Sequence, residues 1–389
     1  MSRSHPSPVI YLIGTSGHPN YGDEVVTATW LRHYAEHLPD AEVWLDTPRP
    51  GQSAVLFDGL HPGLRCVDTL FHACWNAPGE SADEVLTFGP TLLDEPRRIP
   101  REVSGLAVLL RADLIHVLGG GYINALWPRH LALLSIARAA ADRTGAHTVL
   151  TGAGLVPALD DSAALLAEVL SGFDVVDVRD EASASLLAGQ VPQATLTADD
   201  SFLGLASLPR AKPPHPGVVL CIQDDLRTVG LEVVADYCVR TIEHWAARTE
   251  PVLLLECLPP GDQAVRPLLE PHLPGLTTMS FDELWRDGLP LARGQRWIST
   301  RFHPHLLAAA AGVWGVGLVT GGDYYQNKHA SLIALGSEWH VTSDFSAPVD
   351  AGCIDVSPFG GSLPVIQRAK RSLADAAVAA AVRRVAERS

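Results

Sequence analysis

The stretch VIYLIGTSGHPNYGDEVVTATWLRHYAEHL, residues 9–38, contains an apolar run, a short turn and an amphipathic segment. The run VIYLIG (9–14) has the composition of a buried strand. Apolar residues then recur at every fourth position from Val26 to Leu38, which predicts a helix over 23–38. A strand that enters a helix through one turn is the first half of a βαβ unit, so the stretch favours an α/β fold.

Strand-like runs alternate with helical patterns along the rest of the chain. Further strands are expected at 43–46, 113–119, 147–154, 174–179, 217–223, 252–257, 297–300 and 315–320. Helices are expected near 125–143, 161–171, 229–247 and 262–270, from about 303, and at 368–389. Residues 47–105 interrupt the pattern and are expected to form a loop-rich insertion. Such alternation predicts parallel, doubly wound sheets with helices on both faces.

The length of 389 residues predicts two domains. We expect an N-terminal Rossmann-like domain at 1–206, a Pro-rich linker at 207–216 and a C-terminal Rossmann-like domain at 217–365. A closing helix at 366–389 is expected to pack back across the domain boundary. Two doubly wound domains joined by one linker usually bind ligand in the cleft between them, at the carboxyl ends of their strands.

Composition excludes several classes of protein. The formal net charge of -15 argues against a nucleic-acid binder, which needs a basic face for phosphates. The six cysteines form no C-x-x-C pair, which favours reduced thiols over a secreted disulfide framework. The start MSRSHPSP lacks the apolar core of a signal peptide, and the long uncharged stretch after His305 is too rich in glycine for a membrane span. We therefore expect a cytoplasmic protein without an integral membrane segment.

The turn GHPNYGDE (17–24) has two interpretations. Gly17 and Gly22 permit unusual backbone conformations and leave room for a ligand, while Asp23 and Glu24 suit the first turn of a helix. A well-capped turn explains the same residues, and neither the G-x-G-x-x-G nor the P-loop spacing is present.

A second glycine-rich turn follows the strand DLIHVLG. Gly119, Gly120 and Gly121 stand in a row, and backbone N–H groups there can hold an anion at a helix start. The alternative is a tight turn under close helix packing.

Basic side chains follow three other predicted strands. Arg179 ends the strand at 174–179, and Arg301 offers a planar fork for a carboxylate or phosphate. His303, two residues on, can exchange a proton near neutral pH. With His305 it suggests a metal pair, but no third ligand is evident and no metal is expected. Lys328, expected at the start of a helix after GVGLVT, either faces the same cleft or is simply solvated.

In this order, these segments resemble the polysaccharide pyruvyl transferase family over about residues 9–345. The resemblance rests on seven motifs: N-x-GDE (Asn20, Gly22, Asp23, Glu24), D-L-x-x-x-x-GGG, T-G-A-G-x-x-P (Thr151 to Pro157), V-R-D-E-x-S (Val178 to Ser183), T-A-D (Thr197 to Asp199), R-x-H and Y-x-x-K…LG. It implies a fold similar to two-domain glycosyltransferases of the B type. It also implies transfer of the pyruvyl group of phosphoenolpyruvate onto two sugar hydroxyls as a ketal, with release of phosphate.

The resemblance assigns expected roles to the motif residues. Arg301 and Arg179 suit the anion of phosphoenolpyruvate, and His303 is the expected proton-transfer residue. Lys328 is a further substrate contact, although Gln326 and Asn327 stand where the family commonly has Asp-Pro. The other expected substrate contacts are Asn20, Gly22, Asp23, Gly119, Gly120 and Gly121. No cofactor is needed beside phosphoenolpyruvate as donor substrate, and the insertion at 47–105 would fit an acceptor-specific region.

Two other functions compete with this one. A nucleotide-sugar glycosyltransferase of the same fold needs a carboxylate for the ribose, for which Glu256 and Asp323 are candidates. A non-catalytic family member would act as a binding subunit, although the retained Arg301, His303 and triple glycine argue against it. A homo-oligomer is compatible with each of these functions.

Overall fold

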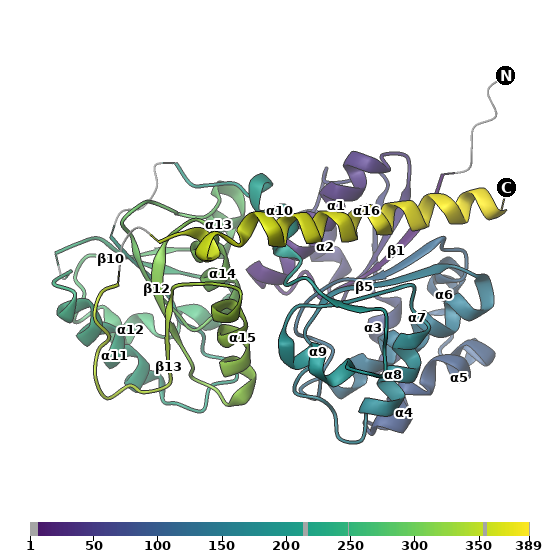
Figure 1. Ribbon diagram of the computed structural model, residues 1–389, viewed down its shortest axis with the longest axis horizontal. Helices are drawn as coiled ribbons and strands as arrows, with labels where there is room; N and C mark the ends of the chain where they lie inside the picture. Colours follow the sequence, from purple (N-terminus) through teal and green to yellow (C-terminus); the bar gives the residue numbers. More distant parts are fainter. Residues whose placement is uncertain (1–6, 213–216, 248, 353–355, 389) are drawn as a thin grey trace. The chain divides into compact units, whose positions relative to one another are not determined.

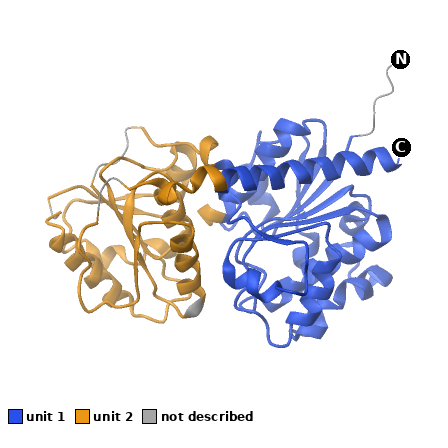
Figure 2. Cartoon of the chain, in the orientation of Figure 1, with its two compact units in different colours: residues 1–18, 23–204, 366–389 blue, residues 19–22, 205–365 orange. Residues whose placement is uncertain are grey.

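The computed structural model describes residues 7–212, 217–247, 249–352 and 356–388. The chain forms two compact units (Figures 1 and 2). Unit 1 comprises residues 1–18, 23–204 and 366–389, and unit 2 comprises residues 19–22 and 205–365. The C-terminal helix thus belongs to unit 1, and the short segment 19–22 belongs to unit 2.

Unit 1 is built on a seven-stranded parallel sheet with the order β3-β2-β1-β4-β5-β6-β7. Its strands are β1 (Val9–Ile13), β2 (Glu42–Asp46), β3 (Leu64–Val67), β4 (Leu114–Val117), β5 (His147–Ala153), β6 (Val175–Val178) and β7 (Ala194–Leu196). Its helices are α1 (Tyr21–His37), α2 (Pro50–Leu56), α3 (Thr69–Cys74), α4 (Ala82–Leu86), α5 (Phe88–Asp94), η1 (Pro96–Arg98), α6 (Val103–Leu109), η2 (Pro128–His130), α7 (Leu131–Thr144), α8 (Ala163–Ser171), α9 (Glu181–Leu187), α10 (Ser201–Gly204) and α16 (Leu363–Arg388).

Unit 2 repeats the plan with a six-stranded parallel sheet in the order β10-β9-β8-β11-β12-β13. Its strands are β8 (Val218–Cys221), β9 (Val252–Leu255), β10 (Leu276–Met279), β11 (Arg296–Ser299), β12 (Trp314–Leu318) and β13 (His340–Thr342). Its helices are η3 (Leu205–Ser207), α11 (Leu231–His244), η4 (Gly261–Gln263), α12 (Arg266–Leu269), α13 (Phe281–Asp287), α14 (Phe302–Ala310), α15 (Asp323–Ala334) and η5 (Pro358–Gly361).

Both sheets have the strand order of a Rossmann fold, so the prediction of two doubly wound α/β domains is confirmed. In each sheet the order reverses once, between β1 and β4 in unit 1 and between β8 and β11 in unit 2. Ligands of such sheets bind outside the carboxyl ends of the strands at this reversal point. The reversal point of each unit is therefore where functional residues are to be sought.

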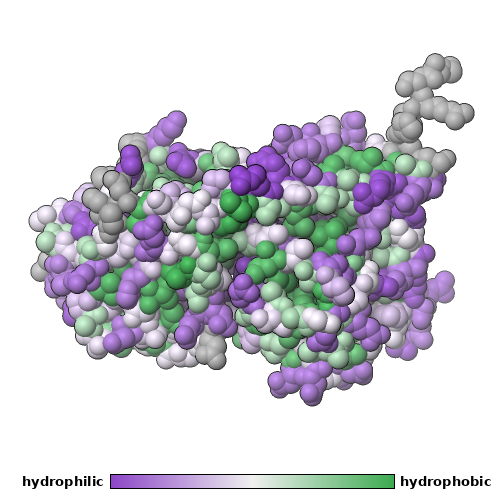
Figure 3. All heavy atoms as spheres, viewed as in Figure 1, coloured by the Kyte–Doolittle hydropathy of each residue, from purple (hydrophilic) through white to green (hydrophobic). Residues whose placement is uncertain are grey.

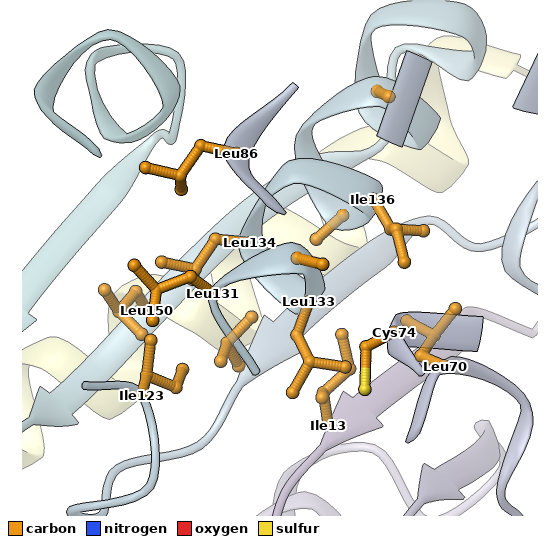
Figure 4. Packing of buried hydrophobic residues seen from close by; sticks show 14 of the residues in the cluster. Ile13, Leu70, Cys74, Leu86, Ile123, Leu131, Leu133, Leu134, Ile136 and Leu150 are labelled. Atoms are coloured by element: carbon orange, nitrogen blue, oxygen red, sulfur yellow. The ribbon is translucent and has the colours of Figure 1, made fainter. Parts of the chain in front are cut away.

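The insertion at 47–105 contributes to the core of unit 1. The prediction that it is loop-rich is wrong. Residues 47–105 form five helices, α2 to α6, and contribute the edge strand β3. Helices α3, α4 and α5 pack against α7. Figure 4 shows Leu133 of α7 in one cluster with Ile13 of β1 and Leu70 of α3. Because α7 is covered by the sheet and by the insertion, it is apolar on nearly all sides, as a buried helix must be.

The surface of the described chain is mixed. Hydrophilic residues are spread over the visible face of both units, with hydrophobic patches between them (Figure 3). None of the described helices is both long and apolar enough to span a lipid bilayer. Five of the six cysteines lie in the described part, where they form no disulfide, and Cys353 lies outside it.

Candidate functional site

The turn after β1 is held together by its own motif residues. The backbone N–H of Gly17 donates to Oε1 of Glu24 at 2.7 Å, and Glu24 is fully buried. Gly17 has a φ of +77°, and a Cβ atom there would lie 2.6 Å from the carbonyl oxygen of Arg49. Gly17 is thus required by the turn itself. Asp23, half-buried in the first turn of α1, lies beside Gly120 in unit 1.

Gly22 has a different neighbour. A Cβ atom on Gly22 would lie 1.8 Å from Nδ1 of His303, so only glycine lets the imidazole ring rest on this backbone. The segment is tied to unit 2 by Tyr21, whose N–H donates to the carbonyl of Cys257 at 2.8 Å. The structure therefore brings Gly22 and His303 together within unit 2. Asn20 is half-buried in the same short segment.

The three glycines after β4 do not offer their N–H groups in the way the sequence suggested. The N–H of Gly119 donates to Oδ2 of Asp200 at 3.2 Å, and the N–H of Gly120 donates to the carbonyl of Gly152 at 3.3 Å. Two of the three donors are therefore used inside the protein. The N–H groups of Gly119 and Gly120 are thus not available to an anion in this structure. A contact of Gly119, Gly120 or Gly121 with another part of a substrate stays a prediction.

Arg179 is where three of the motifs of unit 1 meet. Its buried guanidinium lies 3.6 Å from the carboxylate of Asp180 and 3.5 Å from that of Asp199. A Cβ atom on Gly154 would lie 2.7 Å from its nitrogens, so this glycine makes room for the arginine. Asp180 also caps α9 by accepting the N–H of Ser183 at 2.8 Å.

Arg301 stands at the reversal point of unit 2, immediately before α14. Its guanidinium donates from Nε to both oxygens of Asp262, at 2.8 and 2.7 Å, and from Nη2 to Asp225 at 2.9 Å. Asp262 is fully buried and also accepts the N–H groups of Cys257 and Leu258, whereas the side chain of Asp225 is 41% exposed. Burial alone would lower the pKa of Arg301, but the attraction of Asp262 and then Asp225 raises it above its usual value.

The two carboxylates that hold Arg301 escaped the sequence analysis. Asp225 follows β8 and Asp262 follows β9, so both come from strand ends far from Arg301 in sequence. The signal that could have found them is position alone, since the carboxyl ends of parallel strands lie at one edge. Cys221, Cys257 and Asp262 are close enough to hold a metal, but Arg301 already supplies the cation to Asp262.

His303 and His305 do not share a site. His303 is half-buried at the start of α14, beside Gly22 and the ring of Phe302. His305 is fully buried, with Nδ1 2.9 Å from Nδ1 of His329 in the core of unit 2. Burial lowers the pKa of His329 to about 4 and also lowers the pKa of His305 well below its ordinary value, so this pair is neutral near pH 7.

The sequence predicted Lys328 at the start of a helix. In the structure it lies in the middle of α15. Its Nζ is 3.9 Å from the centre of the Tyr324 ring and 5.1 Å from that of Tyr325, which are cation–π distances. Tyr325 is placed near the Arg301 cluster, because Asp225 contributes, after burial, to raising the pKa of Tyr325 to about 12. Lys328 thus reaches the neighbourhood of Arg301 through an aromatic pair.

Glu256 and Asp323 were the candidate carboxylates for a ribose contact. Glu256 is buried and accepts from the side chain of Gln263 at 2.6 Å and from the N–H of Phe281 at 3.0 Å, at the start of α13. These contacts give Glu256 a structural role. The side chain of Asp323 lies outside the described part of the protein.

The insertion contains a cavity of about 250 Å³ in unit 1. Its lining combines buried apolar side chains with exposed polar ones: Phe88, Leu92 and Ile99, and Asn76, Asp83 and Thr91. Trp75, next to the lining residue Asn76, is 64% exposed.

Proteins of known structure share the fold at low sequence identity. A putative UDP-N-acetylglucosamine 2-epimerase from Listeria monocytogenes is 12% identical with a TM-score of 0.53, covering 95% of this chain and 88% of that chain. The UDP-GlcNAc 2-epimerase from Neisseria meningitidis bound to UDP-GlcNAc is 11% identical with a TM-score of 0.52, covering 97% and 100%. HepE from Anabaena in complex with UDP-glucose is 12% identical with a TM-score of 0.51, covering 97% and 95%.

At such identities the likeness is one of fold, the two-Rossmann fold of B-type glycosyltransferases and their structural relatives. Among curated proteins, none matches the chain significantly in sequence. The model of one protein family does match, that of polysaccharide pyruvyl transferase, over residues 20–322. This range contains six of the seven motifs in full and takes in most of the chain, so the chain belongs to the polysaccharide pyruvyl transferase family.

Proposed function

We propose that the chain transfers the pyruvyl group of phosphoenolpyruvate onto two hydroxyls of a sugar or glycan precursor, forming a ketal and releasing phosphate. The observation that carries the proposal is the state of Arg301 at the reversal point of unit 2. One of its partners, Asp262, is buried and fixed, and the other, Asp225, is 41% exposed. An anionic substrate that displaces the exposed carboxylate gains a planar guanidinium already held in place.

The reaction needs anion binding and proton transfer, and no redox step. Two C–O bonds form between acceptor oxygens and the central carbon of phosphoenolpyruvate, and the bond from that carbon to the phosphate oxygen breaks. Of the two hydroxyl protons released, one is balanced by the proton that turns the methylene carbon into a methyl group, and the other leaves with phosphate. Arg301 is proposed to hold the carboxylate or phosphate, and a fixed cation there stabilises the charge that develops.

His303 is the proposed proton-transfer residue. It stands two residues after Arg301, and its ring rests on the backbone of Gly22, which limits the orientations open to it. An imidazole can give and take a proton near neutral pH. Lys328 is proposed as a second cation for the donor.

We assign the acceptor to unit 1. Asp23 beside Gly120 offers a carboxylate to sugar hydroxyls, and the cavity in the insertion offers polar groups around an apolar floor. Both features suit a neutral polyol better than an anion. The expected contact of Arg179 with the anion of phosphoenolpyruvate stays a prediction, and a cytoplasmic location is part of the same proposal. Replacing the cavity residue Thr91 by Val is expected to raise the KM for the acceptor and leave that for phosphoenolpyruvate unchanged.

The test is acceptor-dependent release of phosphate from phosphoenolpyruvate, measured with a panel of nucleotide-linked and lipid-linked sugars. His303→Asn is expected to lower kcat by about 100-fold to 10,000-fold, the usual contribution of general acid–base catalysis. The matched control is His340→Asn, because His340 is an exposed histidine of the same unit, and this variant is expected to retain full activity. No release from the wild-type protein with any acceptor, or equal rates for the two variants, would refute the assignment.

Ligand-induced stabilisation separates the remaining alternatives. A ligand that binds only the folded protein raises its melting temperature. Phosphoenolpyruvate is expected to raise it, and UDP-glucose is not, because Glu256 is already engaged at the start of α13. The reverse result would favour a nucleotide-sugar glycosyltransferase. Stabilisation by phosphoenolpyruvate without turnover would favour a non-catalytic binding subunit.

A further inference from the structure

Lys370 is a fully buried lysine in unit 1. It lies in α16, the long C-terminal helix that Figure 2 shows as part of that unit. Its Nζ donates to Oδ2 of Asp177 at 2.7 Å and to Oδ1 of Asp200 at 2.8 Å, and none of the three side chains is exposed. Lysine is almost never fully buried unless it is paired, so this cluster is a specific feature of the unit.

Asp200 links Lys370 to the strand ends at the reversal point. Its Oδ2 accepts the N–H of Gly119, just after β4, at 3.2 Å and the hydroxyl of Thr151 in β5 at 2.5 Å. The same oxygen accepts the indole N–H of Trp30 in α1 at 2.9 Å. One carboxylate therefore ties the glycine-rich turn, the neighbouring strand and the first helix to the lysine.

Asp177 does the same for the other side of the cluster. Its Oδ2 accepts the N–H of Gly152 at 2.9 Å, and its Oδ1 accepts the hydroxyl of Thr197 at 2.8 Å. Gly152 and Thr197 belong to the T-G-A-G and T-A-D motifs, so the lysine reaches these motifs through a single carboxylate.

Asp200 of this cluster also explains why two of the motif positions are glycine. A Cβ atom on Gly119 would lie 2.8 Å from Oδ2 of Asp200, and one on Gly152, whose φ is +50°, would lie 2.6 Å from Oδ1. Side chains are thus excluded at both positions because a carboxylate occupies the space. The backbone at the reversal point is fitted to the charged cluster.

The charges in the cluster favour an ionised lysine. Burial alone would lower the pKa of Lys370, but the attraction of Asp177 and Asp200 outweighs burial and raises the pKa above its usual value. A buried ion pair is a costly way to stabilise a fold, because apolar side chains of similar volume often do as well or better. What such a cluster supplies is one defined arrangement of the groups it joins.

We propose that Lys370 is a positioning residue for the acceptor: through Asp200 and Asp177 it holds the backbone of residues 119–121 and 151–154 in the conformation that binds sugar hydroxyls. The proposal rests on the proposed function, which assigns the acceptor to unit 1. It gives α16 a role in the reaction without contact to substrate. The helix supplies the cation that sets the shape of the reversal point.

The experiment compares charge variants of the cluster. Lys370→Met alone leaves two buried carboxylates without their cation and can prevent folding, so it is paired with the triple variant Lys370→Met/Asp177→Asn/Asp200→Asn, which removes all three charges at similar volume. The matched control is Arg371→Gln, which removes a positive charge from the exposed next residue of α16. Each protein is studied at a temperature at which it is fully folded.

The readouts are the KM for each substrate, kcat, and hydrogen exchange of the amides in 118–122 and 151–154. We expect the triple variant to raise the KM for the acceptor by at least tenfold, to leave the KM for phosphoenolpyruvate within twofold, and to exchange faster in these two segments only. Arg371→Gln is expected to match the wild type. A merely structural role would lower the melting temperature and leave the two KM values and the local exchange pattern unchanged, and that result would overturn the proposal.

Failure of the proposed function is distinguishable from failure of this inference. If the wild-type protein transfers no pyruvyl group, the exchange measurement still decides whether Lys370 sets the backbone of the two segments. Wild-type exchange rates in the triple variant would overturn the positioning role whatever the reaction is. Faster exchange confined to the two segments would support it.

Discussion

Both units contain a buried cation that donates hydrogen bonds to two carboxylates near the carboxyl ends of the strands, but the clusters around Lys370 and Arg301 differ in exposure. In unit 1 the cation is Lys370, and both of its partners are fully buried. In unit 2 the cation is Arg301, which has one fully buried partner, Asp262, and one partner, Asp225, whose side chain is 41% exposed.

The difference separates a structural cation from one that can bind a ligand. An anion cannot replace a partner of Lys370 without opening the core of unit 1. At Arg301 it needs only to displace an exposed carboxylate, and the pairing with Asp262 keeps the guanidinium in place while it does so. The fork of arginine also suits a carboxylate or phosphate better than the point charge of lysine does.

The largest expected effect comes from removing Arg301. We call Arg301, Asp262 and Asp225 the open cluster, because the side chain of Asp225 is partly exposed. Arg301→Gln should lower kcat/KM for phosphate release by about 1000-fold, or about 4 kcal/mol of transition-state stabilisation. Arg301→Lys should recover only part of this loss, because the charge returns without the fork. Arg286→Gln, which removes an exposed arginine from α13, is the control and should retain wild-type kinetics. Wild-type rates in Arg301→Gln would erase the distinction between the two cations.

The two partners of Arg301 should differ in their effect on stability. Asp262→Asn leaves a buried guanidinium without its main counter-charge and should cost about 3 kcal/mol or more. Asp225→Asn removes a partly exposed partner and should cost less than about 1 kcal/mol. Hydrogen exchange gives the free energy of opening of α14, which measures the stability cost of each variant. Helix α7 of unit 1 serves as internal reference. Equal costs for the two variants would mean that the cluster in unit 2 is as closed as the one in unit 1.

The sequence predicted the central strands of both sheets and missed the four edge strands. The missed strands are β3 and β7 in unit 1 and β10 and β13 in unit 2, which stand at the ends of the two sheets. Their residues are mostly half-buried or exposed, whereas the central strands are buried on both faces and read as continuous apolar runs. Edge strands lack that signal, because only one neighbour and one face protect them.

The candidate site was also predictable only in part, because only some of its residues carry a local sequence signal. Arg301 and His303 follow a buried strand and precede a helix, so their place at the sheet edge could be inferred from local pattern. Asp225, Asp262 and Lys370 carry no local signal, because what matters about each is a partner distant in sequence. Gly119 and Gly152 were visible as glycines, but the carboxylate that excludes their side chains was not.

Acid should weaken the packing around α14 in unit 2. The pKa of His329 is lowered by burial from 6.5 to about 4, and burial also lowers the pKa of His305 well below its ordinary value. The folded protein therefore binds fewer protons than the unfolded chain in this window, so stability is lost as the pH falls from 6.5 towards 4. For His329 the loss is at most about 3 kcal/mol.

In unit 1 burial lowers the pKa of His116 to about 3, and it also lowers the pKa of the less buried His18, His33, His61 and His130. Hydrogen exchange of α14 and α7 between pH 7 and 4.5 measures the two units separately, after correction for the intrinsic pH dependence of exchange. The opening free energy of α14 should fall as the pH is lowered, and His329→Gln should reduce this slope. A slope of α14 that is unaffected by His329→Gln would contradict the assignment of its acid response to this pair.

The smallest expected effect is an improved KM for phosphoenolpyruvate when Asp225 loses its charge. It is the most direct test of anion binding at the open cluster. Asp225 competes with an incoming anion for Nη2 of Arg301 and repels it as well. Asp225→Asn keeps the shape and removes the charge, so the KM for phosphoenolpyruvate should fall about fivefold, a change of about 1 kcal/mol, with kcat nearly unchanged. Asp224→Asn is the matched control, because its carboxylate pairs with Arg227 instead. A collapse of kcat in Asp225→Asn would show that this carboxylate takes part in the reaction itself, and an unchanged KM would show that the anion does not bind at Arg301.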